Sequence, residues 1–310
     1  MTLLGSTSDL NLDLSVYSVT EGGGPAIITV TRRGNLSRQV SANFPTSNGT
    51  ANPAVVGTTQ IQVVPPSGPG LGFSTPTNAR VIMATVTAPG ILFSGGATTT
   101  AVGENLQTQL SLSLGATPPG PVTVTVTVAS TGIATIVNGN NATVEGSSTV
   151  TFTNVTTASV GSIFVQGRAA SGTTTITAQA PGYADAVLTV TTQPSGFIIN
   201  SPGNFSTTTT SGNTTIQIFS VRLNATTRNS DGTQAVRGGL TVNVPLTATD
   251  QTGGPGVGTI TTNPVVFTGN QIIQNTAFDP AAVGTSLISV GVPTGFSSPS
   301  TSRQITATVN

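Results

Sequence analysis

Cysteine, histidine and lysine are all missing from the 310 residues of this chain. Without cysteine there can be no disulfide, no thiolate metal site and no cysteine nucleophile. Without histidine the chain lacks the commonest general base and the commonest metal ligand. Without lysine it can form neither a Schiff base nor a lysine cross-link between subunits. These absences remove most ways of building an active site, so we expect no enzymatic activity and no cofactor.

Charge is also scarce, because only 6% of the residues are charged and the formal net charge is zero, whereas about 25% is usual. The nine basic residues are all arginines, and they are too dispersed to form the basic stripe that binds nucleic acid. No apolar run approaches the ~20 residues of a membrane-spanning helix. We therefore predict that the chain neither binds nucleic acid nor inserts into a membrane.

The N-terminal residues lack the basic and apolar regions of a signal peptide. The rest of the composition, with little charge, no cysteine and much threonine, glycine and asparagine, is nevertheless typical of secreted proteins. We expect an extracellular or cell-surface location, with a leader that was removed or is not part of this sequence.

What the chain does contain is β-forming sequence with an internal repeat. Threonine and valine favour pleated strands. A hairpin pattern at 172–190, with a turn at Pro181-Gly182, returns at 284–309, which is 112 residues later. The segments 122–128 and 240–246 both alternate strictly, and turn signals recur every 8–12 residues with no helical periodicity. The pattern predicts an all-β fold of three tandem β-sandwiches.

The predicted domains are a tail at 1–9 and sandwiches at 10–88, 89–193 and 194–310. The closing strands at 172–190 have the form Gly-x-x-x-Ile-Thr-Ala…Gly-Tyr…Val-x-Val. Over 89–310 the chain therefore resembles bacterial immunoglobulin-like domains, which implies a spacer or a binding module on a bacterial surface or in an extracellular fibre. The segment 19–34 resembles the opening of Calx-beta domains, and this resemblance covers about residues 10–51. The Asp-Tyr-containing loop and the long closing strands of that family are missing here, so no calcium role is carried over.

Few acidic residues are placed to hold a metal ion. Glu21 and Glu104 lie in equivalent turns, with Asp9 and Asp13 near the first in sequence. A calcium site needs several oxygen ligands that converge on one point. Nine acidic residues spread over three units are better interpreted as solvated turn residues, so we predict no metal site.

Two further kinds of site find little support in the sequence. The glycine-rich segment 253–258 is followed by neither a lysine nor a helical pattern, so it is interpreted as a loop and not a phosphate site. Hydrolysis by paired carboxylates stays open, but the chain has no tryptophan and only Tyr17 and Tyr183 to stack against a sugar. We predict no catalytic residues.

Seven Asn-X-Ser/Thr sequons permit N-glycosylation: Asn35, Asn48, Asn141, Asn154, Asn204, Asn213 and Asn224. A chain so rich in serine and threonine produces about this many by chance. The threonine tracts at 98–100 and 207–210 allow O-linked sugar, although a β-forming edge is the favoured interpretation.

The first unit, at 79 residues, is shorter than the 105 and 117 residues of its neighbours, and we count about two strands fewer. A sandwich that lacks strands exposes an unpaired edge, which a strand from another chain can complete. Our hypothesis is a head-to-tail extracellular filament, with residues 1–9 as the donor strand. The candidate subunit-interface residues are Leu3, Leu4, Leu10, Leu12 and Leu14. A flexible tail on a compact short domain is the alternative. The rival function is an adhesin or phage-surface stalk that binds glycan or a host protein.

Overall fold

The computed structural model describes residues 9–12, 16–20, 28–33, 46–47, 57–62, 81–250 and 252–310. The chain divides into two compact units. The first comprises Met1–Gly90 with the short segments Gly115–Thr117 and Gly182–Ala184. The second comprises Ile91–Leu114, Pro118–Pro181 and Asp185–Asn310, and so contains most of the second and third predicted domains.

The fold is all-β and immunoglobulin-like, as predicted. Within the described residues the sole helix is a single 3-10 turn, η1 (Gly139–Asn141), which begins after Asn138. No helix in this part of the chain is long and apolar enough to cross a membrane. The exact domain boundaries and the completion of the first sandwich by a neighbouring subunit stay predictions.

The described residues of the first unit form two sheets. One consists of β1 (Asp9–Leu12) and β3 (Val30–Arg33), and the other has the order β2-β6-β5-β4. Its strands are β2 (Val16–Thr20), β4 (Thr46–Ser47), β5 (Gly57–Gln62) and β6 (Val81–Thr87). Among the described residues of this unit, Ile61 and Ile82 form a buried cluster, with Tyr17 packed against them. Leu10 and Val16, which are close in sequence, thus lie in two strands of different sheets.

The first sandwich of the second unit, called here the second sandwich, consists of two sheets with the orders β12-β10-β14-β15-β8 and β11-β13-β9-β7. Its strands are β7 (Ile91–Phe93), β8 (Thr99–Gly103), β9 (Leu106–Leu114), β10 (Val122–Val128), β11 (Ala134–Asn138), β12 (Thr149–Val155), β13 (Ser159–Gly167), β14 (Gly172–Gln179) and β15 (Ala186–Gln193). The predicted segment 122–128 coincides with β10, and the hairpin at 172–190 corresponds to β14 and β15.

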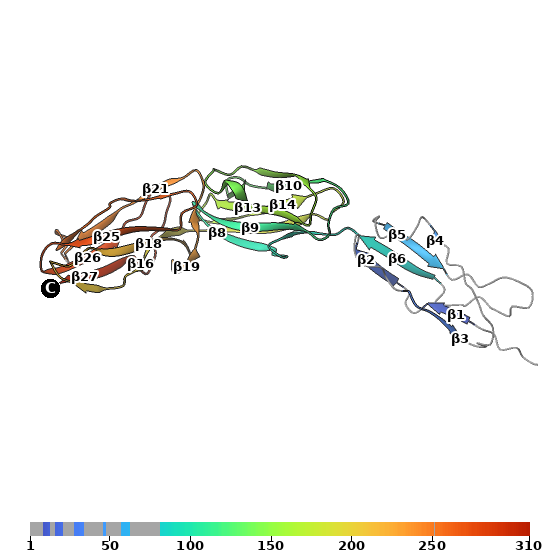
Figure 1. The fold of residues 1–310 in the computed structure, drawn as a ribbon, viewed down its shortest axis with the longest axis horizontal. Coiled ribbons are helices and arrows are strands. Elements are labelled where there is room, and N and C mark those ends of the chain that lie inside the picture. Colours follow the sequence, from blue (N-terminus) through green and yellow to red (C-terminus); the bar gives the residue numbers. More distant parts are fainter. Residues whose placement is uncertain are drawn as a thin grey trace, which may run out of the picture. The chain divides into compact units, whose positions relative to one another are not determined.

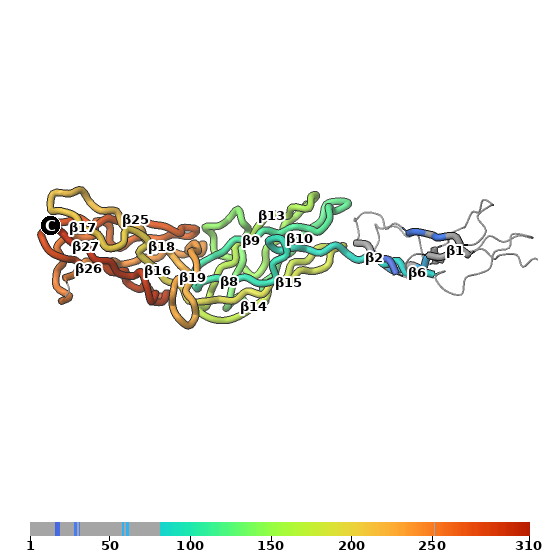
Figure 2. Tube along the Cα trace, turned by 90° about the horizontal axis from the view of Figure 1, so that it is seen from below, coloured from blue at the N-terminus to red at the C-terminus, as the bar shows by residue number. Residues whose placement is uncertain are grey.

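The third sandwich repeats this plan with sheets β16-β18-β25-β23 and β17-β27-β26-β22 and the pair β21-β24. Its strands are β16 (Ser195–Ser201), β17 (Phe205–Thr207), β18 (Thr214–Leu223), β21 (Thr241–Val244), β22 (Leu246–Thr249), β23 (Gly258–Ile260), β24 (Val265–Thr268), β25 (Ile273–Pro280), β26 (Gly284–Val290) and β27 (Gln304–Val309). The predicted continuous strand at 240–246 is interrupted at Pro245, which has no N–H to donate to a sheet. Both views place the second and third sandwiches end to end (Figures 1 and 2).

One pairing recurs in all three predicted domains. The last strand pairs in parallel with an early strand: β6 with β2, β15 with β8, and β27 with β17. All the other pairs are antiparallel within the described strands. The repeat seen in the sequence is therefore a repeat of topology, since each unit closes its sandwich in the same way.

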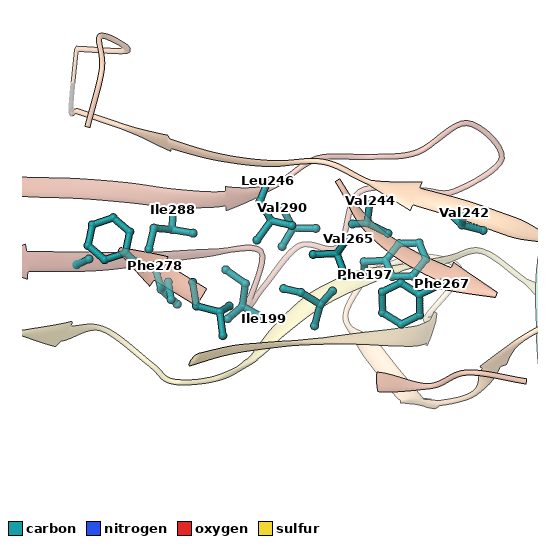
Figure 3. Close-up of a cluster of buried hydrophobic side chains, with 14 of the residues drawn as sticks. Phe197, Ile199, Val242, Val244, Leu246, Val265, Phe267, Phe278, Ile288 and Val290 are labelled. Carbon is teal, nitrogen blue, oxygen red and sulfur yellow. The ribbon is translucent and has the colours of Figure 1, made fainter. Parts of the chain in front are cut away.

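Alternation along each strand builds the cores, because successive side chains point to opposite faces of a sheet. In β27 the apolar residues Ile305, Ala307 and Val309 are buried, and the alternating Thr306 and Thr308 are half-buried. In the third sandwich the core contains Phe197, Phe267 and Phe278, with Ile288 and Val290 between the sheets (Figure 3). The rings of Phe197 and Phe267 lie 4.9 Å apart, centroid to centroid.

Candidate functional site: the joint between two sandwiches

The most elaborate polar structure in the described part of the chain lies where the second sandwich meets the third. The second sandwich contributes the β8–β9 turn, the β11–β12 connection and the β13–β14 turn. Leu106 begins β9 in the second sandwich, yet its side chain is 0% exposed and belongs to the core of the third sandwich. The hydrophobic core of one sandwich is therefore completed by a residue of the other.

A long connection in the third sandwich reaches across the joint. Residues 224–240, which we call the arm, link β18 to β21, whereas the equivalent connection from β9 to β10 spans only residues 115–121. The arm contains β19 (Ser230–Thr233) and β20 (Ala235–Val236). β20 pairs antiparallel with Gln107 and Leu106 of β9, and so adds a strand of the third sandwich to a sheet of the second.

Two buried glutamines lie at the centre of the joint. Gln107 is 2% exposed and Gln166 is 0% exposed. The Gln107 Oε1 accepts from Gly238 N of the arm at 2.9 Å and from Gln166 Nε2 at 3.0 Å. The Gln107 Nε2 donates to Ala142 O at 2.9 Å and to Asn270 Oδ1 at 3.2 Å. A buried polar group without partners is costly, so Gln107 favours the joined arrangement over any arrangement that separates these partners.

A third glutamine fixes the arm to the edge of the second sandwich. Gln234 Oε1 accepts from Gly103 N at 2.8 Å, and Gln234 Nε2 donates to Ala101 O at 2.9 Å. The side-chain amide thereby makes the two bonds that a neighbouring strand would make. Arg222 adds a bond from Nη1 to Ala101 O at 3.0 Å and is held by Asp231 at 3.1 Å.

The β8–β9 turn presents Asn105 to the third sandwich. Asn105 has a left-handed backbone (φ 58°), which asparagine tolerates better than most residues. Its Nδ2 donates to Gly295 O at 2.9 Å, and its Oδ1 accepts from Arg237 Nε at 3.2 Å. The carbonyl of Glu104, in the same turn, accepts a hydrogen bond from the hydroxyl of Ser195 in β16. One turn of the second sandwich thus contacts three segments of the third.

Glycines allow the two backbones to approach closely. A side chain at Gly238 would place its Cβ 2.1 Å from Val144 O, and one at Gly269 would meet Thr143 O at 3.2 Å. Gly239 N donates to Thr143 O at 2.8 Å across the same contact. Because backbone and not a flexible side chain blocks the space, these positions accept only glycine in the observed arrangement.

The charged groups at the joint form a small cluster on its surface. Glu145 Oε1 lies 2.6 Å from Arg168 Nη1 in its own sandwich and 3.6 Å from Arg237 Nη1 of the arm. The hydrogen bond and charge of Arg168, with the charge of Arg237, lower the pKa of Glu145. Burial is the main cause that lowers the pKa of Arg237, and burial raises the pKa of Glu104.

The polar side chains of the joint bond to one another and to backbone groups across it. Within the described residues no group of three or more acidic side chains could hold a metal ion. Of the acids considered for calcium, Glu104 lies in the joint and Asp9 begins β1, while Glu21 and Asp13 fall outside the described residues. The predicted loop at 253–258 follows Asp250, whose Oδ1 accepts from Thr252 Oγ1, Thr252 N and Gly254 N. The side chain at this loop therefore caps a turn.

The predicted interface leucines are only partly described. Leu10 and Leu12 lie on β1, opposite Arg32 and Val30 of β3. Leu3, Leu4 and Leu14 lie outside the described residues. Their role in an interface stays a prediction.

Five of the seven sequons fall in the described part, and each of their asparagines is exposed: Asn141, Asn154, Asn204, Asn213 and Asn224. Asn224 Oδ1 accepts from Thr226 N and Thr227 N and so caps a turn of the arm. Asn35 and Asn48 lie outside the described residues. Exposure permits glycosylation at the five positions, and its occurrence stays a prediction.

The sequence pattern predicted the strands that meet at the joint but not the hydrogen bonds between them. Gln107 and Gln166 are paired across β9 and β13, and both lie out of phase with the buried apolar residues of their strands, so the strand pattern gives no signal that they are buried. The arm corresponds to extra length in the third unit, but no pattern in the sequence indicated that it pairs with β9 across the joint.

Comparison with known proteins identifies similar folds but no family. No protein-family model and no curated protein matches the chain. Among solved structures, domains 4 and 5 of the S-layer protein SbsC are 20% identical, over 59% of this chain and 98% of that one, with a TM-score of 0.25. The adhesin InvE of Yersinia pseudotuberculosis is 14% identical, over 72% and 58% of the two chains, with a TM-score of 0.27. The calcium-binding domain pair CBD12 of CALX1.1 is 12% identical, over 67% and 82%, with a TM-score of 0.25.

Proposed function

We propose that this chain is a non-enzymatic structural module of a bacterial extracellular or cell-surface assembly, in which the second and third sandwiches act as one stiff body. The observation that carries the proposal is the joint. Domains joined by a flexible linker can move without sharing a core, a sheet or buried hydrogen bonds. At this boundary the two sandwiches share a core residue, a strand added from one sandwich to a sheet of the other, and buried glutamines, and each of these features resists bending.

The test is a comparison of domain orientation in the full-length protein and in two glycine variants. Residual dipolar couplings of the native chain should fit one alignment tensor for residues 91–114, 118–181 and 185–310 together. Gly238→Val places a side chain against Val144 O and should require two tensors. Gly203→Val, where nothing lies within 4 Å of the added Cβ, is the matched control and should behave as the native chain does. Two tensors for the native chain would refute the proposal.

The finer proposal is that subunits assemble head to tail into a filament by non-covalent strand addition. Support comes from the lack of cysteine and lysine for covalent joints, from the shortness of the first unit and from the two-stranded sheet that β1 forms with β3. Heterologous contacts of this kind produce open fibres. Electron microscopy of the purified protein with and without residues 1–9 tests it. Filaments that disappear on deletion are expected, whereas monomers in both samples would end the idea.

A further inference from the structure

A groove of about 410 Å³ lies at the open side of the second sandwich, away from any residue used in the joint. Its walls come from the hairpin of β12 and β13 and from Asn138 at the end of β11. β12 is the edge strand of its sheet, and β11 is the edge strand of the opposite sheet. The groove therefore lies between the two sheets where no further strand covers them.

Two β-bulges shape this groove, one on each strand of the hairpin. On β12 the register shifts so that Thr153 and Asn154 together oppose one residue of β10. On β13 the extra residue is Val160, between Ser159 and Gly161. Bulges bend a strand and redirect its side chains, and they are frequent beside functional sites.

The first bulge turns Asn154 outward. Asn154 has a left-handed backbone (φ 59°), which costs energy in a residue other than glycine. Without the extra residue the alternation would direct Asn154 inward, after Val150 and Phe152. With it, Val155 takes the buried position and Asn154 is exposed. Locally strained backbone thus serves to present an amide at the groove.

The second bulge makes room for an aromatic ring. A Cβ added at Gly161 would lie 3.0 Å from Phe152 Cε1, so the ring packs where Gly161 has no side chain. Phe152 is half-buried and lines the groove. Beside it the Thr151, Thr153 and Asn154 side chains make no hydrogen bond to any described residue, which leaves their donors and acceptors available.

The third sandwich shows that the fold does not require these features. Its equivalent strands, β24 and β25, pair with β21 and β18 without any register shift. The two bulges of the second sandwich are therefore specific to it, and its repeat folds without them.

The chemistry of the groove selects its ligand. Its lining contains no acidic or basic residue, so nothing in it would neutralise a phosphate, sulfate or metal ion. Hydroxyls and side-chain amides both donate and accept hydrogen bonds, and the half-buried Phe152 ring adds apolar contact area. The volume falls in the range of small-ligand sites, about 300–1,000 Å³. A neutral sugar combines an uncharged ring, many hydroxyls and an apolar face.

From these observations we propose that the groove between β12, β13 and the end of β11 is a binding site for a neutral sugar or the neutral end of a glycan. The site is independent of the stiff joint, so either proposal can fail without the other. Because Asn154 is also a sequon, a glycan attached there would occupy the same groove and exclude a free one.

The experiment is a titration of the full-length protein, produced in a host that does not glycosylate it, with glucose, galactose, mannose and N-acetylglucosamine at millimolar concentration. At least one sugar should shift the amide resonances of residues 151–160 in a ¹⁵N correlation spectrum and leave residues 265–276 unchanged. Sialic acid and inorganic phosphate should not shift them, because the groove has no cation to hold an anion.

Two variants and a control make the assignment specific. Asn154→Gly keeps the left-handed backbone at no cost but removes the amide, so affinity should fall about tenfold. Phe152→Ala should reduce the affinity for the sugar by more than Asn154→Gly does. If Phe152→Ala unfolds the hairpin, the affinity of Asn154→Gly alone tests the proposal. Asn213→Gly, at an exposed asparagine of the third sandwich, should bind as the native chain does. Absence of shifts with all four sugars, or equal shifts with the anions, would overturn the proposal.

Discussion

The second and third sandwiches share one topology, and two of their differences coincide with the joint and with the groove. The connection from β18 to β21 is a 17-residue arm, where the equivalent connection from β9 to β10 has 7 residues. The hairpin of β12 and β13 has two bulges, where β24 and β25 have none in the equivalent pairings. Shared strands explain why the domains fold alike. The arm and the two bulges are features that one of the two sandwiches folds without.

The largest effect is expected from truncation of Leu106, because this residue lies in one sandwich and packs in the core of the other. Leu106→Ala should lower the free energy of unfolding by about 2–5 kcal/mol, as for other buried leucines. The loss should fall on the third sandwich, although the substitution is in the second. Urea unfolding followed by amide resonances of each sandwich measures it.

Leu110→Ala is the matched control for that variant. Leu110 lies four residues further along β9, on the same face, and is 6% exposed, but it is not part of the core of the third sandwich. Its truncation should destabilise the second sandwich first. If both variants destabilise the same sandwich, the core is not shared in the way described.

A smaller effect is expected from the buried amide at the centre of the joint. Gln107→Leu keeps the approximate volume but removes the partners of Gly238 N, Gln166 Nε2 and Ala142 O. Groups left buried and unpaired cost about 1–3 kcal/mol, and the loss should appear as easier separation of the sandwiches. Amide hydrogen exchange of the arm measures this, and exchange at Gly238 should accelerate most.

Gln109→Leu, two residues along the same strand, provides the comparison. Gln109 is exposed and bonds only to Ser162 within the described residues, so its replacement should leave exchange in the arm unchanged. Equal acceleration in both variants would mean that the strand, and not the joint, is affected.

The smallest effect belongs to the charge cluster, and it depends on pH. The Arg168 hydrogen bond and charge, with the charge of Arg237, lower the pKa of Glu145 below its usual value of 4.5. The ionised carboxylate therefore stabilises the folded chain fully above pH 4.5, and this contribution disappears as the pH falls through the lowered value. Because Glu145 is 54% exposed, solvent screening limits the contribution to about 1 kcal/mol or less.

Glu145→Gln should accordingly lower stability slightly at neutral pH and have no effect at a pH below the folded pKa. Denaturant midpoints measured across the acid range test this. A difference that persists unchanged in strong acid would show that the carboxylate contributes through something other than its charge.

The sequence was sufficient to predict the sandwich repeat, because alternation of valine and threonine with glycine at turns is a local signal that matches the strands, as at Val122–Val128. It was insufficient for the joint. β19 and β20 lie in a polar arm whose order comes from Gln107, Ala101 and Gly103 of another domain. Such partners are more than one hundred residues away, and no local pattern encodes them.

The candidate groove escaped prediction for a related reason. The search for an aromatic platform considered tryptophan and tyrosine, whereas the ring at the groove is Phe152, placed at a core position of an alternating strand. Its exposure follows from bulges that shift one residue of register. A single extra residue in a strand is visible only once the pairing is known.

If the second and third sandwiches form one stiff body, two spin labels placed one in each sandwich keep a fixed separation. Because the chain has no native cysteine, spin labels can be attached at Thr173→Cys and Thr247→Cys, two exposed positions in different sandwiches. Double electron–electron resonance on the full-length protein should give a single narrow distribution that Gly238→Val broadens. A broad distribution in the otherwise native chain would contradict the account.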